Sequence, residues 1–275
     1  MALIVNNNPA SISAQRNLTN STNQLGRSVE RLSSGLRITR AADDAAGLGL
    51  SETLRAQIRS INQAVRNSSD GISLTQIADG AAATIGSLLA RLRELASQSS
   101  SGTVGTTERS YIDQEFLALR SEMDRIAGVT EFNGQALTSG STISFTMQVG
   151  FKSGTGNTLT MDLNDLTITS LGLSSVNVST ANNAQSALSN IDSAISAVAT
   201  ARSEYGSLQN RFEATIANLS ISSENLTSAE SRIRDADIAY ETSQFTKNQV
   251  LVQTGIAVLA QANTLPQQAL ALLRG

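Results

Sequence analysis

The chain has 275 residues, of which 40% are hydrophobic, 3% aromatic and 16% charged, and its net charge at pH 7 is −3. It contains no cysteine and no histidine, which excludes disulfides, Cys/His metal sites, thiol nucleophiles and imidazole bases, and we expect no cofactor. The small net charge gives no reason to expect nucleic acid as a partner. No window holds the roughly 18–20 continuous apolar residues of a membrane span, so we expect no membrane insertion.

The N-terminal segment is amphipathic and poor in charge. Residues 1–15 carry no charged side chain, and residues 1–8 lack the basic start and the apolar run of a secretory signal. Asn8 followed by Pro9 predicts a helix start, with proline at the first helical position. Leucine and valine then recur at spacings of seven, four, three and four, which is typical of a coiled-coil seam: Leu18, Leu25, Val29, Leu32 and Leu36.

The region after residue 44 is predicted to continue as helices. The spacing of four and three recurs at Leu54, Ile58, Ile61 and Val65, and again at Leu88, Leu92 and Leu95. Asp43 and Asp44 precede this region and invite a metal or acid/base interpretation. Adjacent helical residues point in different directions, however, and no third ligand is evident nearby. We therefore expect these two carboxylates to act at a connector or a helix end.

The pattern changes to alternation between about residues 138 and 175. Apolar residues occupy every second position in two short runs, with a glycine-rich turn, residues 154–157, between them. A small β-hairpin region inserted between long helices is the prediction. The alternating residues are Ile143, Phe145, Met147 and Val149, and then Leu159, Met161 and Leu163.

The second half returns to helix after residues 171–173, and its strongest helical run extends from Leu188 to Ile233. Arg232 and Arg234 are spaced for i, i+3 ion pairs with Asp235 and Asp237. Residues 248–273 carry no charge but keep several glutamines, which suits burial against protein rather than lipid. The helical core seam is predicted at Ile191, Ile195, Val198, Leu208, Phe212, Ile216 and Leu219, and a terminal assembly seam at Val250, Ile256, Leu259, Leu270 and Leu273.

These elements predict a mainly α fold, in which long antiparallel helices form a coiled-coil rod with a small central β-hairpin region. Each end helix is marginal alone, because nothing covers its apolar stripe. We expect the two ends to pair with each other and with neighbouring copies. Head-to-tail contacts between such rods grow into helical filaments, so the pattern favours an assembling structural protein over an enzyme.

Several segments go beyond pattern and resemble bacterial flagellin, the subunit of the flagellar filament. They are RLSSGLRITRAADDAAGLG at 31–49, NSSDGISLTQIADG at 67–80, EMDRIAGVTEFNGQ at 122–135, and the C-terminal stretch that begins SRIRDADIAYETSQF at 231. The resemblance covers roughly 1–137 and 176–275. The central 40 residues replace the large outer domains of longer flagellins.

The resemblance implies that residues 1–43 and 236–275 pair as an inner-tube coiled coil, that 44–137 and 176–235 form a helical rod domain, and that 138–175 is an outer insert. It implies a homopolymer that supports swimming motility, secreted through the flagellar type III apparatus without a cleaved signal. The implied partners are a filament cap protein, a hook–filament junction protein, an export chaperone and a host Toll-like receptor. By the same resemblance, the receptor would contact Arg91, Leu95 and Glu115; the alternative is that these residues serve a subunit interface or a solvated helix face.

Two other classes of protein compete with a filament subunit as interpretations of this sequence. A hook–filament junction protein resembles flagellin at both ends and is the alternative function, but the match through residues 67–135 disfavours it. An enzyme housed in the central region is excluded, because about 40 residues without histidine or cysteine leave no room for a catalytic domain.

Overall fold

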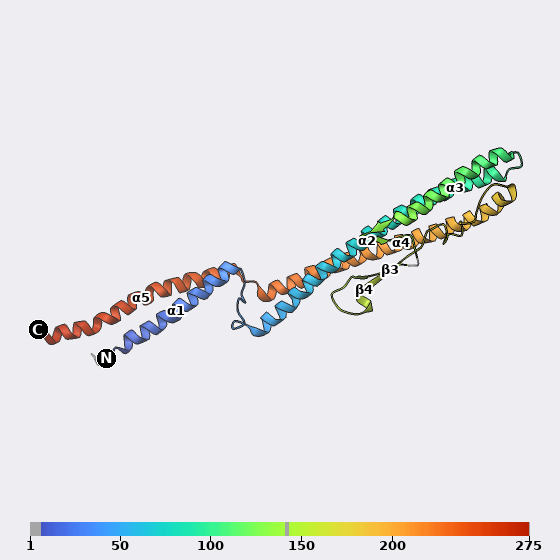
Figure 1. Cartoon of the computed structure of the whole chain (residues 1–275). Coiled ribbons are helices and arrows are strands. Elements are labelled where there is room, and N and C mark those ends of the chain that lie inside the picture. Colours follow the sequence, from blue (N-terminus) through green and yellow to red (C-terminus); the bar gives the residue numbers. More distant parts are fainter. Residues whose placement is uncertain (1–6, 141–142, 275) are drawn as a thin grey trace. The chain divides into compact units, whose positions relative to one another are not determined.

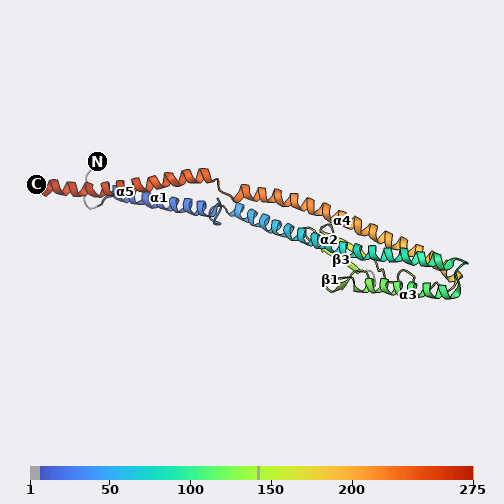
Figure 2. The same cartoon turned by 90° about the horizontal axis from the view of Figure 1, so that it is seen from above.

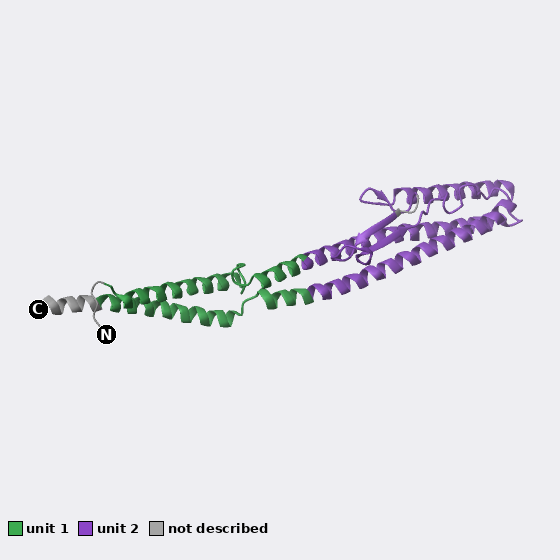
Figure 3. Cartoon of the chain, turned by 90° about the horizontal axis from the view of Figure 1, so that it is seen from below, with its two compact units in different colours: residues 1–56, 225–275 green, residues 57–224 purple. Residues whose placement is uncertain are grey.

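The computed structural model describes residues 7–140 and 143–274, with the side chains of 143 and 265–274 left out. The chain divides into two compact units (Figure 3). We call residues 1–56 with 225–275 the terminal unit, and residues 57–224 the central unit. The sequence predicted three parts with different boundaries from these two units. The assignment of those parts to an inner tube, a rod and an outer insert stays a prediction.

The terminal unit is built from two helices that lie side by side, α1 (Pro9–Ser34) and α5 (Ile238–Arg274) (Figures 1 and 2). The predicted start of α1 is confirmed: Pro9 is its first residue, and the Asn8 Oδ1 accepts a hydrogen bond of 3.1 Å from the Ser11 N–H. The helix ends at Gly35, whose φ of 70° is a left-handed conformation that glycine adopts without strain. The predicted terminal helix pair is therefore present.

A short non-helical crossing connects α1 to the next helix. Leu36 forms an antiparallel bridge with Asp235, and the Arg37 N–H donates to the Arg234 carbonyl at 2.7 Å. Ile38 is buried in this crossing. The two connecting segments of the terminal unit thus hold each other through backbone hydrogen bonds.

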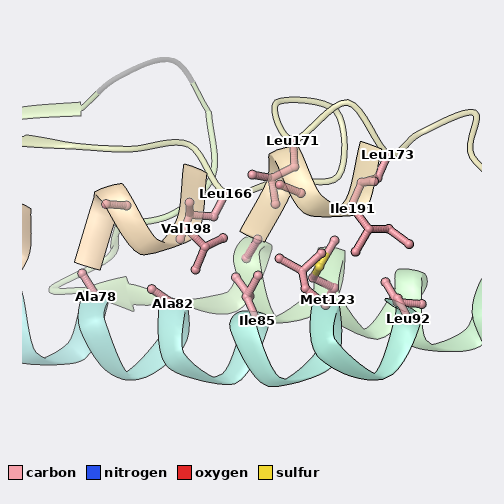
Figure 4. Packing of buried hydrophobic residues seen from close by; sticks show 14 of the residues in the cluster. Ala78, Ala82, Ile85, Leu92, Met123, Leu166, Leu171, Leu173, Ile191 and Val198 are labelled. Atoms are coloured by element: carbon pink, nitrogen blue, oxygen red, sulfur yellow. The ribbon is translucent and has the colours of Figure 1, made fainter. Parts of the chain in front are cut away.

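The central unit contains most of α2 (Ala45–Ser100), all of α3 (Thr106–Val129) and most of α4 (Ala181–Arg234). Its core is lined by α2, by Met123 of α3, by Ile191 and Val198 of α4, and by the segment before α4 (Figure 4). Two glycines, Gly102 and Gly105, lie in the turn that separates α2 from α3. The long helical region predicted from 44 to 137 is therefore interrupted.

The predicted β-hairpin is confirmed. Strands β3 (Ile143–Gln148) and β4 (Thr158–Leu163) pair antiparallel, with Phe145 opposite Met161. The glycine-rich turn forms a short 3-10 helix, η1 (Thr155–Asn157). Because alternate residues share a face, Leu159, Met161 and Leu163 all point into the core.

A second, smaller hairpin was not predicted. Strands β1 (Glu131–Phe132) and β2 (Gln135–Ala136) pair around Asn133 and Gly134, which both have positive φ, 51° and 75°. An Asn-Gly pair with two positive φ angles is typical of a two-residue hairpin turn. The predicted helix through residue 137 is wrong here, since α3 ends at Val129.

The helical seam predicted on α4 faces the interior of the central unit. The structure buries Ile191, Val198, Leu208, Phe212 and Leu219 and leaves Ile195 and Ile216 partly buried. The predicted ion pairs of Arg232 and Arg234 are wrong. Arg234 reaches the Glu52 carboxylate at 2.6 Å instead, and Asp237 caps α5 by accepting from the Tyr240 N–H at 3.1 Å.

Candidate assembly surface

The contact between α1 and α5 follows a heptad pattern on both helices. Buried and half-buried residues recur at spacings of four and three, which brings one stripe of each helix against the other. Many of these positions are small or polar rather than large and apolar. The seam consists of Ala14, Leu18, Ser21, Leu25, Ser28 and Leu32 on α1, and of Glu241, Phe245, Asn248, Val252, Gly255, Leu259 and Ala262 on α5.

Specific contacts fix the antiparallel register of this seam near both ends. At one end the Asn8 side-chain amide donates to the Ala262 carbonyl at 2.8 Å, and the Arg31 guanidinium lies 3.7 Å from Glu241 at the other. In between, a Cβ placed on Gly255 would lie 3.2 Å from the Leu18 Cδ1. The two helices therefore approach closely at a position that only glycine fills without displacing its neighbour.

The predicted terminal seam residues fall into three groups. Leu18, Leu25, Leu32 and Leu259 lie in the α1–α5 seam, and Leu36 lies in the crossing. Val29, Val250 and Ile256 point outward, with 48%, 53% and 56% of their surface exposed. Leu270 and Leu273 lie among the residues whose side chains the structure does not describe.

Large apolar side chains remain uncovered on the terminal unit. Among its described residues only Ala14, Ile38 and Ala262 are buried apolar side chains. The exposed ones are Ile12, Val29, Leu50, Ile238, Tyr240, Val250, Leu251, Ile256 and Val258. Apolar surface concentrated in this way marks an interaction surface on a folded protein.

One side of α5 gathers these residues into a stripe. Val250 and Leu251 are followed seven residues later by Ala257 and Val258, so the two pairs share one side of the helix, next to the seam. We call these four residues the α5 apolar face. Thr254 lies between the two pairs, and the adjoining positions Thr246, Gln249 and Gln253 are polar. The exposed surface of α5 is therefore itself two-sided.

Asp43 and Asp44 lie at the connector, as expected, and cap local structure. The Asp43 Oδ2 accepts hydrogen bonds from the Thr39 hydroxyl and from the N–H groups of Thr39 and Arg40 at 3.1–3.3 Å. Burial raises the pKa of Asp43, but these hydrogen bonds and the charge of Arg31 outweigh it and leave the pKa lowered. The Asp44 Oδ1 accepts from the Gly47 N–H at 2.8 Å, at the start of α2.

The residues of the predicted receptor contact lie in the central unit. Arg91 on α2 pairs with Glu115 on α3 at 2.8 Å and with Glu94 at 2.9 Å, and the hydrogen bond to Glu115 is the main cause of its raised pKa. Leu95 is 2% exposed and packs in the core. A protein that docks here would meet the guanidinium and the carboxylates before the leucine side chain, and the receptor contact through Arg91, Leu95 and Glu115 stays a prediction.

Two family models match the chain over most of its length. The bacterial flagellin N-terminal helical region matches residues 5–142, and the bacterial flagellin C-terminal helical region matches residues 188–273. A flagellin from Halalkalibacterium halodurans is 46% identical over 272 residues, which cover 99% of this chain and all of that protein. The unmatched stretch between the two models contains β3 and β4.

Solved structures agree with the helical fold. A crystal structure of flagellin from Bacillus cereus is 30% identical, with a TM-score of 0.50, and covers 56% of this chain and 88% of that one. A protein from Vibrio parahaemolyticus described as flagellar hook-associated is 14% identical, with a TM-score of 0.58 over 70% of this chain and all of that chain. At that identity the second likeness concerns the fold alone. No helix in the described part of the chain is long and apolar enough to cross a membrane.

Proposed function

The chain belongs to the bacterial flagellin family, and from this premise we infer that copies join through the exposed apolar residues of the terminal unit. The chain is a structural subunit of the extracellular flagellar filament, which supports swimming motility, and it is not an enzyme. What we propose is which part of the chain makes the filament contacts.

The observation that carries the proposal is the uncovered apolar surface of α1 and α5. Each large apolar side chain removed from water contributes about 1.5–3 kcal/mol, so several together favour association strongly. The stretch of α5 from 248 to 273 also has no charge that would be stranded by burial. Packing against other copies removes this surface from water without burying an ion.

The resemblance further supports a layered arrangement of the filament. In it, residues 1–43 and 236–275 form the inner tube, 44–137 and 176–235 form the surrounding helical domain, and 138–175 lies outermost. The heptad seam of α1 and α5 suits a tube wall made of paired helices. A repeated contact that is not self-complementary then extends into a helical filament.

A hook–filament junction protein is the competing assignment. It rests on the likeness to the Vibrio protein, which extends to the fold only. The flagellin relationship, in contrast, reaches 46% identity over nearly the whole chain. The filament subunit is therefore the assignment we make.

The finer partners belong to the same proposal. We expect secretion through the flagellar type III apparatus, an export chaperone that holds the C-terminal region, a filament cap protein and a hook–filament junction protein. For a host Toll-like receptor, the exposed Arg91–Glu115 pair is the surface we propose. A charged pair of this kind can exchange its partners on docking.

The test is polymerisation of the purified chain, seen by electron microscopy and measured by sedimentation. We expect the full chain to form filaments, and chains that lack residues 1–40 or 240–275 to remain unpolymerised. Circular dichroism checks that the central helices of each shortened chain are still folded. Full filaments from both shortened chains would contradict the role given to the terminal unit.

A further inference from the structure

A small polar pocket lies at the end of α1, entirely within the terminal unit. Its lining comes from the last turns of α1 and from the connector that follows, and its volume is about 90 Å³. Three guanidinium groups face it together with two carboxylates. The lining residues are Arg27, Glu30, Arg31, Thr39, Arg40, Ala42 and Asp43, and we call this the Arg27 pocket.

The charged groups of the pocket are already paired, with one exception. Arg40 donates to both oxygens of Glu30, at 3.0 and 2.6 Å. Arg31 lies between two carboxylates, 3.8 Å from Asp43 and 3.7 Å from Glu241. Within the described part of the chain, no carboxylate lies within ion-pair distance of Arg27, which is exposed.

Charge is distributed unequally between the two units. The terminal unit has ten basic and eight acidic residues, a net charge of +2, whereas the central unit has ten basic and fifteen acidic residues, a net charge of −5. Five exposed carboxylates of the central unit make neither an ion pair nor a side-chain hydrogen bond with any described residue: Asp70, Glu108, Glu131, Asp162 and Glu224. Unlike charges on the two units favour contact between the terminal unit of one copy and the central unit of another.

We propose that the Arg27 pocket binds a carboxylate from the central unit of a second copy of the chain. The arginine fork forms two parallel hydrogen bonds with a carboxylate, so it fixes direction as well as distance. Arg27 is thereby a residue that sets the register between copies. The proposal rests on the filament function, and adds to its apolar contacts a charged contact between unlike units.

The first experiment measures the critical concentration for polymerisation of Arg27→Gln by sedimentation at low and high salt. The matched control is Arg16→Gln, because Arg16 is also exposed on α1 but lies outside the pocket. We expect Arg27→Gln to raise the critical concentration roughly three- to tenfold at low salt, with the difference shrinking at high salt as screening weakens the wild-type contact. Arg16→Gln should have the critical concentration of the wild type. Arg27→Lys keeps the charge but not the fork, so its critical concentration should lie between those of the wild type and Arg27→Gln. Thermal unfolding of each monomer should be unchanged.

The second experiment identifies the carboxylate. Arg27→Glu is combined in turn with Asp70→Lys, Glu108→Lys, Glu131→Lys, Asp162→Lys and Glu224→Lys. We expect one of these reversals to restore polymerisation that Arg27→Glu alone weakens.

If the wild-type chain forms filaments and Arg27→Gln has the same critical concentration as Arg16→Gln, the pocket proposal is overturned and the filament proposal stands. Rescue by none of the five reversals would overturn it as well, and would point to a free inorganic anion as the ligand. Failure of the wild-type chain to polymerise would overturn the filament proposal first, and this proposal with it.

Discussion

The central and terminal units solve the problem of apolar burial in opposite ways. In the central unit, side chains from α2, α3, α4, β4 and the 166–178 segment meet in one core whose largest members, such as Phe116 and Phe212, are fully buried. In the terminal unit α1 and α5 pack mainly against each other, and two helices cannot cover each other on more than one side. Its apolar residues are thus divided between an internal seam and an outer surface.

The difference is also visible in the kind of residue used at the interior positions. Large aliphatic and aromatic side chains fill the central core, whereas Ser28, Glu241 and Asn248 are buried in the α1–α5 seam. Buried polar residues in a coiled coil specify register while lowering stability. We therefore expect the central unit to be stable by itself and the terminal unit to gain much of its stability from other copies.

The largest test of this contrast is a cavity in the central core. Phe212 is completely buried, and its ring lies against Gly71 of α2. We expect Phe212→Ala to lower the free energy of unfolding of the monomer by about 3–5 kcal/mol, because it removes apolar contacts and leaves a void. Urea unfolding below the critical concentration for polymerisation measures this. On the same helix, Ile221 is 61% exposed, and Ile221→Ala should change stability by no more than about 0.5 kcal/mol.

The reverse behaviour is expected of the α5 apolar face. The double variant Leu251→Ala and Val258→Ala should leave the unfolding of the monomer unchanged but weaken subunit association by about 2–4 kcal/mol, the value of burying those two side chains. Sedimentation gives the critical concentration. The control is Gln249→Ala with Gln253→Ala, on exposed positions outside that face. Equal effects of the two double variants would show that this face is not where copies meet.

The seam between α1 and α5 offers a test of intermediate size. Gly255 packs against Leu18, whereas Gly26 on α1 has no atom within 4 Å of an added Cβ. Gly255→Val and Gly26→Val change helix propensity by the same amount. The difference between their effects on stability therefore reports the contact of the new side chain with Leu18. We expect Gly255→Val to lower the stability of the terminal unit by about 1–3 kcal/mol more than Gly26→Val. Hydrogen exchange of the α1 and α5 amides measures this difference in stability. Identical exchange in the two variants would contradict the close packing of α5 against α1 at Gly255.

Much of this fold could be predicted from local patterns. The alternation of apolar residues that ends at Leu163 predicted the strands of the large hairpin. Asn8 with Pro9 predicted the start of α1. The second hairpin was missed although Asn133-Gly134 is a strong signal for a two-residue turn, because the surrounding strands are only two residues long. The interruption after α2 carried a similar signal in Gly102 and Gly105.

The details of the candidate surface were less accessible. A heptad pattern of large apolar residues selects Val250 and Ile256, which lie outside the seam. It does not select Asn248 and Gly255, which lie in the seam. The pair of Arg234 and Glu52 joins residues 182 positions apart, so no local spacing could indicate it. Exposure of Val29 and burial of Leu95 likewise depend on which neighbours the fold brings near.

The smallest expected effect concerns pH and separates the two units once more. The carboxylate of Asp43 accepts three hydrogen bonds in the connector of the terminal unit, and its pKa in the folded chain is below the ordinary value of 3.8. A lowered pKa means that the folded state favours the ionised form, so this contribution to stability is fully present above pH 3.8 and is lost as the pH falls through the lowered pKa. Asp43→Asn should remove this contribution at all pH values and lower the stability of the terminal unit by about 0.5–1.5 kcal/mol, the value of an ordinary hydrogen bond.

Thermal unfolding of the monomer between pH 7 and pH 3, followed by hydrogen exchange at Thr39 and Arg40, measures both effects. Exchange in α3, which belongs to the central unit, is the internal reference and should not respond to the substitution. If Asp43→Asn instead unfolds both units together, the two are coupled in one cooperative transition, and the independence of the central unit is lost.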